Sequence, residues 1–254
     1  MSRQFRVTTS WDDGHPCDLR LADILSRHGI PATFFVPRFN SGHREVVGIE
    51  GIKQLAASFE VGAHTLNHVD LSAVPPLVAE REISGSKSFL EDALGREVTG
   101  FCYPRGKCSP QIASQVKQAG FRYARTVRNF HREPGDDPFI LPTTMQFFPH
   151  RKSVYLRNFA IPPRRVAVET LMVAMSTEDL VERGRRMFAH CRATGTMFHL
   201  WGHSWELEEH DLWRDLEDLF SFLRSACDPG DFVSNSAMAE HVSRFERGVP
   251  RGGR

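Results

Sequence analysis

The chain of 254 residues offers no set of paired cysteines. It has five, an odd and scattered set: Cys17, Cys102, Cys108, Cys191 and Cys227. Such a set does not predict a disulfide framework, and the lack of any Cys-x-x-Cys pair argues against a structural zinc site built from thiolates. Reduced thiols predict a cytoplasmic protein.

Long apolar runs and an excess of charge are also lacking. No apolar stretch approaches the roughly 18 to 20 residues of a membrane-spanning helix, and none precedes the first predicted strand. We therefore expect neither a membrane span nor a secretory leader. The formal net charge is +1, which gives no electrostatic reason to expect binding to nucleic acid or to an anionic membrane.

Strand-like and helix-like segments alternate along the chain. Short segments rich in β-branched and aromatic residues predict strands at 5–9, 32–36, 60–63, 98–103, 121–127, 196–200 and 231–233. Apolar residues at helical spacing predict helices at 17–28, 51–58, 75–94, 109–120, 178–192, 212–226 and 236–245. This alternation is typical of a parallel sheet with helices outside. We expect one α/β domain over residues 1–246, an irregular (β/α) barrel of about seven parallel strands with outer helices, and a flexible tail at 247–254.

Polar side chains follow two of the predicted strands. Asp12 and Asp13 come at the end of the first strand, and adjacent carboxylates repel unless each has a different partner, such as a metal ion, a cation or a shared proton. The same residues also suit a simple turn. His64 and His68 follow the third strand, and their spacing puts both imidazoles on one side of a helical turn.

In a parallel α/β barrel, functional groups gather at the C-terminal ends of the strands. One carboxylate and two imidazoles form a ligand set for a divalent transition metal that leaves positions open for water and substrate. Histidines at this spacing are also common on protein surfaces, so the spacing alone does not establish a metal site.

These motifs resemble those of the polysaccharide deacetylase family, the carbohydrate esterases that contain the NodB homology domain. The family's Thr-Phe-Asp-Asp-Gly motif corresponds to Ser10-Trp11-Asp12-Asp13-Gly14, and its His-Ser/Thr-x-x-His motif to His64-Thr65-Leu66-Asn67-His68. Its Arg-x-Pro-Tyr/Phe-Gly motif corresponds to Cys102-Tyr103-Pro104-Arg105-Gly106, with cysteine at the position of the arginine. The Leu-x-His motif corresponds to the segment that enters His203, and we find no Asp-Trp pair.

The resemblance implies a metal-dependent hydrolase that removes N-acetyl or O-acetyl groups from a sugar or polysaccharide. It implies that Asp13, His64 and His68 bind a divalent metal ion, with zinc as the first candidate and cobalt, nickel or another metal as alternatives. The metal would activate a water molecule and polarise the acetyl carbonyl.

The resemblance also implies roles for residues that do not bind the metal. Asp12 would be the base that takes the proton of the water, and His203 the acid that protonates the leaving amine. The backbone N–H of Tyr103 would help the metal to stabilise the oxyanion. Thr65 would hold the loop that carries the two histidines.

Two departures from the family pattern leave alternatives open. Because the third motif lacks its arginine, Arg105 in the same motif or Arg125 at the end of the next strand would have to pair with the base. Because the Asp-Trp pair is missing, Glu206 is the candidate to orient His203.

The segment around the last predicted strand offers further candidates. His199 points to the opposite face from Leu200 and is either a rival acid or a core histidine. Trp201 and Trp205 would either form an aromatic wall that stacks a sugar ring or pack in the core.

Two other functions stay open at this point. The same site could hydrolyse another non-peptide C–N amide bond in a small cytoplasmic substrate. A degenerate relative could instead bind carbohydrate through its aromatic residues, although the intact Asp-Asp-Gly and His-x-x-x-His motifs argue against a role without catalysis. The sequence does not predict the oligomeric state.

Overall fold

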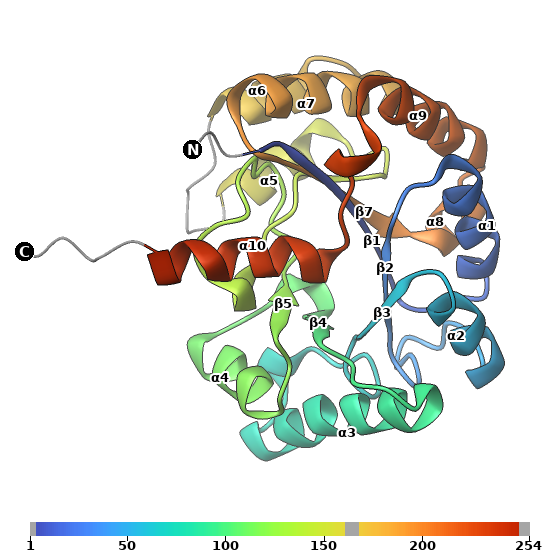
Figure 1. Cartoon of the computed structure of the whole chain (residues 1–254), viewed down its shortest axis with the longest axis vertical. Helices are drawn as coiled ribbons and strands as arrows, with labels where there is room; N and C mark the ends of the chain where they lie inside the picture. The colour runs from blue at the N-terminus through green and yellow to red at the C-terminus, as the bar shows by residue number, and fades with distance from the viewer. Residues whose placement is uncertain (1–3, 161–167, 249–254) are drawn as a thin grey trace, which may run out of the picture.

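The computed structural model describes residues 4–160 and 168–248 and contains a seven-stranded sheet in the order β5-β4-β3-β2-β1-β7-β6 (Figure 1). All strand pairs are parallel. The strands are β1 (Arg6–Asp12), β2 (Thr33–Val36), β3 (Glu60–Ala63), β4 (Gly100–Cys102), β5 (Tyr123–Arg125), β6 (Met145–Gln146) and β7 (Met197–His203). Central β1 is buried from Val7 to Asp12, as expected for a parallel strand covered on both faces.

The sheet curls so that one segment joins its two edges. Leu141 forms a parallel bridge with Arg125 at the end of β5. Only four residues later, β6 begins and pairs with Leu200 and Trp201 of β7. The prediction of an irregular (β/α) barrel with about seven parallel strands is therefore confirmed, and the irregularity lies in this short connecting segment.

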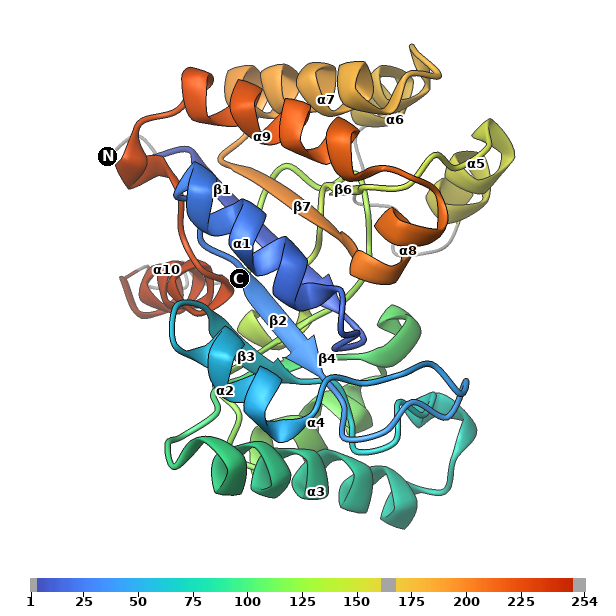
Figure 2. The same cartoon turned by 90° about the vertical axis from the view of Figure 1, so that its right-hand side faces the viewer.

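Helices form a ring outside the strands (Figures 1 and 2). Neighbours contact one another in the order α4, α3, α2, α1, α9, α7, α6 and α5. Their bounds are α1 (Asp18–His28), α2 (Ile49–Ala56), α3 (Pro76–Leu94), α4 (Pro110–Gln118), α5 (Lys152–Ala160), α6 (Val168–Met175), α7 (Leu180–Thr194), α8 (Ser204–Glu209), α9 (Trp213–Ala226) and α10 (Asn235–Gly248). The helical spacing in the sequence predicted α1 well, because Leu21, Ile24 and Leu25 are the residues that it buries.

One detail of the predicted order is wrong. Residues 231–233 form only an isolated bridge between Phe232 and Val7, next to a 3-10 turn at Pro229–Asp231, and the seventh strand is instead the two-residue β6. The predicted tail at 247–254 overlaps the end of α10, and residues 249–254 lie outside the described residues. The domain boundary at residue 246 stays a prediction.

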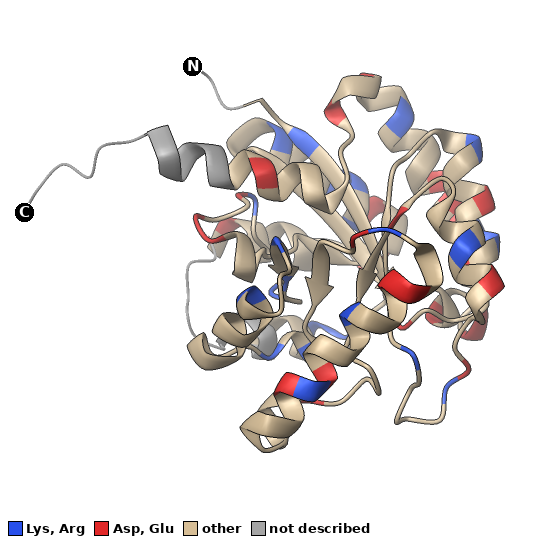
Figure 3. Ribbon diagram, turned by 60° about the horizontal axis from the view of Figure 1, so that its bottom comes forward, with Lys and Arg blue, Asp and Glu red and all other residues tan. Residues whose placement is uncertain are grey.

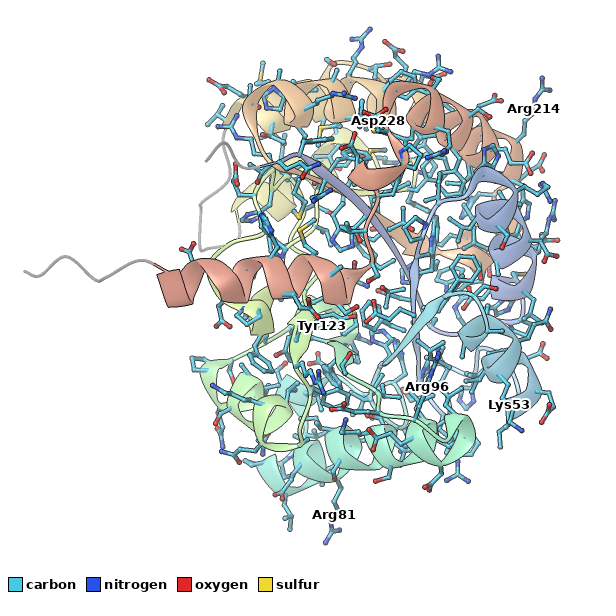
Figure 4. All side chains as sticks on the ribbon, in the orientation of Figure 1. Lys53, Arg81, Arg96, Tyr123, Arg214 and Asp228 are labelled. Carbon is cyan, nitrogen blue, oxygen red and sulfur yellow. The ribbon has the colours of Figure 1, made fainter. Side chains whose placement is uncertain are left out.

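Helix α10 closes the N-terminal end of the barrel, and Glu60 connects it to the sheet. The Glu60 carboxylate accepts hydrogen bonds from the Thr33 hydroxyl (2.7 Å), the Tyr123 hydroxyl (2.8 Å) and the backbone N–H of Ser236 in the first turn of α10 (3.1 Å). Tyr123 lies beside α10 in Figure 4 and packs in one apolar cluster with Ala239 of that helix.

Glu60→Ala is expected to lower the free energy of unfolding by about 1 to 3 kcal/mol, because it leaves several part-buried donors without an acceptor. Urea unfolding would measure this loss. The matched control is Glu97→Ala, which removes an exposed carboxylate that pairs with Arg122 and should change the stability by less than about 1 kcal/mol. Equal urea midpoints for the two variants would show that Glu60 does not anchor α10.

Acidic and basic residues are intermixed along the helices of the ribbon, in keeping with the formal net charge of +1 (Figure 3). Within the described ranges, no helix has the length and apolar character that crossing a membrane requires.

Candidate active site

The parallel register brings the C-terminal ends of β1, β3 and β7 to one rim of the barrel. Asp12 ends β1 and lies beside His203, which ends β7, while His64 directly follows β3. These residues line a pocket of about 420 Å³ together with Asp13 and His68. The five side chains that the sequence suggested for metal binding, base and acid therefore lie around one cavity.

Asp13, His64 and His68 form a group with the spacing of metal ligands. The Oδ1 atom of Asp13 lies 3.6 Å from Nε2 of His64 and 3.0 Å from Nε2 of His68. Ligands about 2.1 Å from one ion are typically about 3.0 to 3.4 Å apart, so the three atoms need only small shifts to share a cation. Asp13 Oδ1 is buried without a hydrogen-bond partner among the described residues. The donor set and its orphaned oxygen thus fit a divalent metal ion.

The charge states of this group also suit a metal ion, whose ligands must be deprotonated. Burial raises the pKa of Asp13, but the nearby imidazoles of His68, His203 and His64 hold it well below its usual value. Burial lowers the pKa of His64 to about 4. Nδ1 of His64 donates to the carbonyl oxygen of Cys102 (2.8 Å), which leaves the lone pair of Nε2 facing Asp13.

A second group, Asp12, His64 and Cys102, is also close enough to hold a metal ion. It fits less well. Asp12 already contacts Arg125, His64 uses Nδ1 for the Cys102 carbonyl, and burial raises the pKa of the Cys102 thiol well above its usual value. A buried neutral thiol is a poor ligand, so Asp13, His64 and His68 are the better set.

Arg125, not Arg105, pairs with Asp12. The Arg125 guanidinium is fully buried and contacts Asp12 Oδ1, and Cys102 Sγ lies 3.7 Å from Asp12 Oδ2. Arg105 is exposed at the rim of the pocket and has positive φ (60°). The predicted catalytic role of Arg105 as partner of the base is corrected accordingly.

The geometry around Tyr103 also differs from the prediction. Its backbone N–H donates to the carbonyl oxygen of Arg125 (3.1 Å), as part of the contact between β4 and β5, and is not free to face an oxyanion. Its buried hydroxyl donates to the carbonyl oxygen of Phe139 (2.9 Å). Tyr103 therefore connects the end of β4 to β5 and to the segment around Phe139.

His203 has the partner that the sequence suggested. Nδ1 lies 2.8 Å from Oε2 of Glu206, one turn later in α8, and Nε2 lies 4.0 Å from Oδ2 of Asp13. Although burial lowers the pKa of His203, the hydrogen bond with Glu206 and the charge of Asp13 raise it to about 9. The rival, His199, is a core histidine: its Nε2 lies 2.8 Å from the Ser10 hydroxyl, and it does not line the pocket.

The loop that carries the histidines has two supports. The Thr65 hydroxyl accepts from the backbone N–H of Val69 (3.2 Å), in keeping with the expected role of Thr65. Sequence patterns missed the second, Glu82 of α3, which accepts from the backbone N–H (2.8 Å) and the side-chain amide (2.6 Å) of Asn67. An acidic residue inside an otherwise apolar helical face is the signal that could have pointed to it.

Backbone conformations at the site are unusual. Asp13, Thr65 and His68 have positive φ values of 77°, 60° and 53°. Such values are uncommon outside glycine and tend to cluster at functional sites. Gly14 also has positive φ, and a Cβ atom there would lie only 2.6 Å from Cγ1 of Val36. The Asp-Asp-Gly turn is therefore packed tightly against β2.

The two tryptophans do not form the open aromatic wall that was one alternative. Trp201 is buried and donates from Nε1 to Oδ1 of Asn129 (2.7 Å). The ring of Trp205 stacks with the imidazole of His203 and is also contacted by the Arg44 guanidinium. Both tryptophans line the pocket, but both are already engaged by neighbouring side chains.

Residues 2–124, from the N-terminus to β5, match the sequence profile of the polysaccharide deacetylase family. This part of the chain therefore has the sequence pattern of the polysaccharide deacetylase family. The matched part contains both Asp-Asp-Gly and His-x-x-x-His, which supply the candidate metal ligands.

About half of the chain is similar to each of two curated proteins. It is 24% identical over 131 residues to YxkH of Bacillus subtilis (strain 168), which is provisionally named a polysaccharide deacetylase, and 28% identical over 141 residues to the chitooligosaccharide deacetylase of Rhizobium leguminosarum bv. trifolii. The alignments cover 51% and 53% of this chain but only 45% and 63% of the two relatives.

A solved structure matches the whole chain. The crystal structure of a protein from Mycobacterium smegmatis, provisionally named a polysaccharide deacetylase, aligns with a TM-score of 0.70 over 100% of this chain and 95% of its own. The sequence identity is 18%, so this likeness shows the fold of the chain and not its substrate.

Proposed function

We propose that the chain is a metal-dependent hydrolase that removes N-acetyl or O-acetyl groups from a sugar or polysaccharide. The observation that carries the proposal is the convergence of Asp13, His64 and His68 on one pocket, with Asp12 and His203 at its walls. The match to the polysaccharide deacetylase family supports an acetylated sugar as the substrate. The five free thiols support a reducing, cytoplasmic location.

Asp13, His64 and His68 would hold the divalent cation, with zinc as the first candidate because one carboxylate and two imidazoles suit it. A bound cation of this kind would supply Lewis acidity toward the acetyl carbonyl and lower the pKa of a water molecule. Asp13 and His64 are buried and His68 is half-buried at the wall of the pocket, so the site would hold the ion while staying open to substrate.

Asp12 would accept a proton from the attacking water. The buried Arg125 holds one oxygen of Asp12 in place, so the carboxylate has little freedom to turn away from the pocket. His203 would then donate a proton to the departing nitrogen or oxygen, because its pKa of about 9 keeps it protonated at neutral pH. Glu206 holds the opposite ring nitrogen and so fixes the direction of the imidazole.

Glu206→Gln is expected to move the alkaline limb of the pH–rate profile to lower pH by about one unit or more. The sign follows from the role of His203: the donor must be protonated, its pKa is raised by Glu206, and removing that charge lets the proton leave at lower pH. The matched control is Glu208→Gln in the same helix, whose carboxylate contacts Arg20 and Trp213 instead. An unchanged alkaline limb in Glu206→Gln would contradict the assignment of His203 as the acid.

The proposed function is tested by stripping the protein of metal, reloading it with zinc or cobalt, and measuring acetate release. The panel should contain N-acetylated chito-oligomers, O-acetylated xylan and small amides. Metal-dependent release from the sugars supports the proposal. Release from the small amides alone would favour an amide hydrolase, and sugar binding without release would favour a non-catalytic relative.

A further inference from the structure

Trp205, in the first turn of α8, contacts the candidate metal ligand Asp13 directly. Its indole N–H donates a hydrogen bond to Oδ2 of Asp13 (2.9 Å). The other oxygen, Oδ1, has no hydrogen-bond partner among the described residues and faces His64 and His68. The two oxygens of one carboxylate therefore have different surroundings, and the indole is the cause.

The Trp205 ring is held by two neighbours. It stacks on the imidazole of His203, with centroids 5.2 Å apart and planes 30° from parallel. The Arg44 guanidinium lies 3.2 Å from the ring centroid and pairs with Oε1 of Glu209 (2.8 Å). Glu209 is the last residue of α8, the helix that also contains Trp205, so Arg44 contacts both ends of this helix.

We infer that Trp205 is a positioning residue, which presents Oδ1 of Asp13 to the metal and keeps His203 beside it. The inference rests on the proposed function, because it assigns Asp13 to the metal site. A carboxylate without a second contact can rotate and bind an ion through either oxygen or both. A hydrogen bond to Oδ2 selects one orientation, as outer-shell partners commonly do for metal ligands.

The Trp205 indole N–H does not need Asp13 as its acceptor in order to be satisfied. A buried indole N–H must find an acceptor, and a core carbonyl or amide oxygen would suffice. Trp201 shows that solution four residues earlier, where the N–H donates to Oδ1 of Asn129 and makes no contact with Asp13. The two tryptophans of one pocket thus provide a matched pair, in which only Trp205 reaches a candidate ligand.

The test compares the zinc affinity of the metal-free wild-type protein, Trp205→Phe and Trp201→Phe by competition with a chromogenic chelator. Trp205→Phe keeps a ring for stacking but removes the donor, and its zinc affinity should fall about 10- to 100-fold. Trp201→Phe removes an indole N–H from the same pocket and should keep the wild-type affinity. The absorption spectrum of the cobalt-loaded protein should change in Trp205→Phe, because the coordination of Asp13 changes with its orientation.

Each outcome decides the question. Equal zinc affinity and cobalt spectra for wild type and Trp205→Phe would overturn the inference and leave the metal site standing. A wild-type protein that binds neither zinc nor cobalt would overturn the proposed metal site and the inference together. If Trp205→Phe fails to fold, β-(3-benzothienyl)alanine at position 205 keeps the ring system and removes only the N–H, and the same loss of affinity is expected from it.

Discussion

Asp12→Asn is expected to lower the rate of acetate release by about 10² to 10⁴-fold while the protein still binds its metal. An amide cannot accept the proton that Asp12 takes from the attacking water. Asp12 Oδ1 contacts Arg125, and the carboxylate lies outside the group formed by Asp13, His64 and His68. Metal content by elemental analysis and turnover on an acetylated chito-oligomer would measure the two effects separately.

Asp13→Asn is the matched control, since it makes the same change one residue later. It should lose metal affinity first, because a neutral amide is a poorer ligand for a hard cation than a carboxylate. Metal loss in Asp12→Asn together with metal retention in Asp13→Asn would reverse the two roles. Full activity in both variants would place the active site elsewhere.

The convergence of Asp13, His64 and His68 could be predicted from the sequence because local structure fixes the three positions. Asp13 and His64 each follow a short buried strand, and parallel pairing brings strand ends to one rim. His68 lies within the same loop as His64, so its place depends on few distant contacts. Such groups follow from element boundaries, which strand and helix patterns indicate.

The separation of the Asp12 and Asp13 side chains depends on a local turn. Along an extended strand, adjacent side chains would point to opposite sides. Asp12 is the last residue of β1, but Asp13 already has a positive φ of 77°. A turn residue, rather than strand alternation, separates the two carboxylates, and sequence patterns did not indicate this conformation.

Contacts between distant segments could be predicted only as alternatives. Both Arg105, in the third motif, and Arg125, at the end of the next strand, were candidates to pair with Asp12. Which arginine reaches Asp12 depends on the curl of the sheet, which brings the end of β5 within reach of the end of β1. No local sequence pattern indicates how close these two strand ends lie. Glu206 was easier to predict because it lies one helical turn from His203.

The role of Trp205 was out of reach for the same reason. Its partners Arg44 and Asp13 are far away in the sequence. An aromatic residue near a strand end is equally consistent with a surface that stacks a sugar ring and with a packed contact. Only the side-chain contacts in the structure show which groups cover the Trp205 ring.

Arg125→Met is expected to lower the free energy of unfolding by about 3 to 5 kcal/mol, because it leaves the Asp12 carboxylate buried without its cation. Both side chains are almost fully inaccessible, with exposed fractions of 0% for Arg125 and 2% for Asp12. The guanidinium also packs against the rings of Phe35 and Trp201, and methionine fills part of that space.

A double-mutant cycle in urea separates the ion pair from the packing. Asp12→Asn combined with Arg125→Met contains no unpaired buried charge, so it should be more stable than Arg125→Met alone although it carries one more substitution. Arg122→Met is the control. It breaks an exposed ion pair with Glu97, neither residue of which lines the pocket, and should lower the free energy of unfolding by less than about 1 kcal/mol. A coupling energy near zero between positions 12 and 125 would mean that Arg125 stabilises the barrel by packing alone and that another group holds Asp12 toward the pocket.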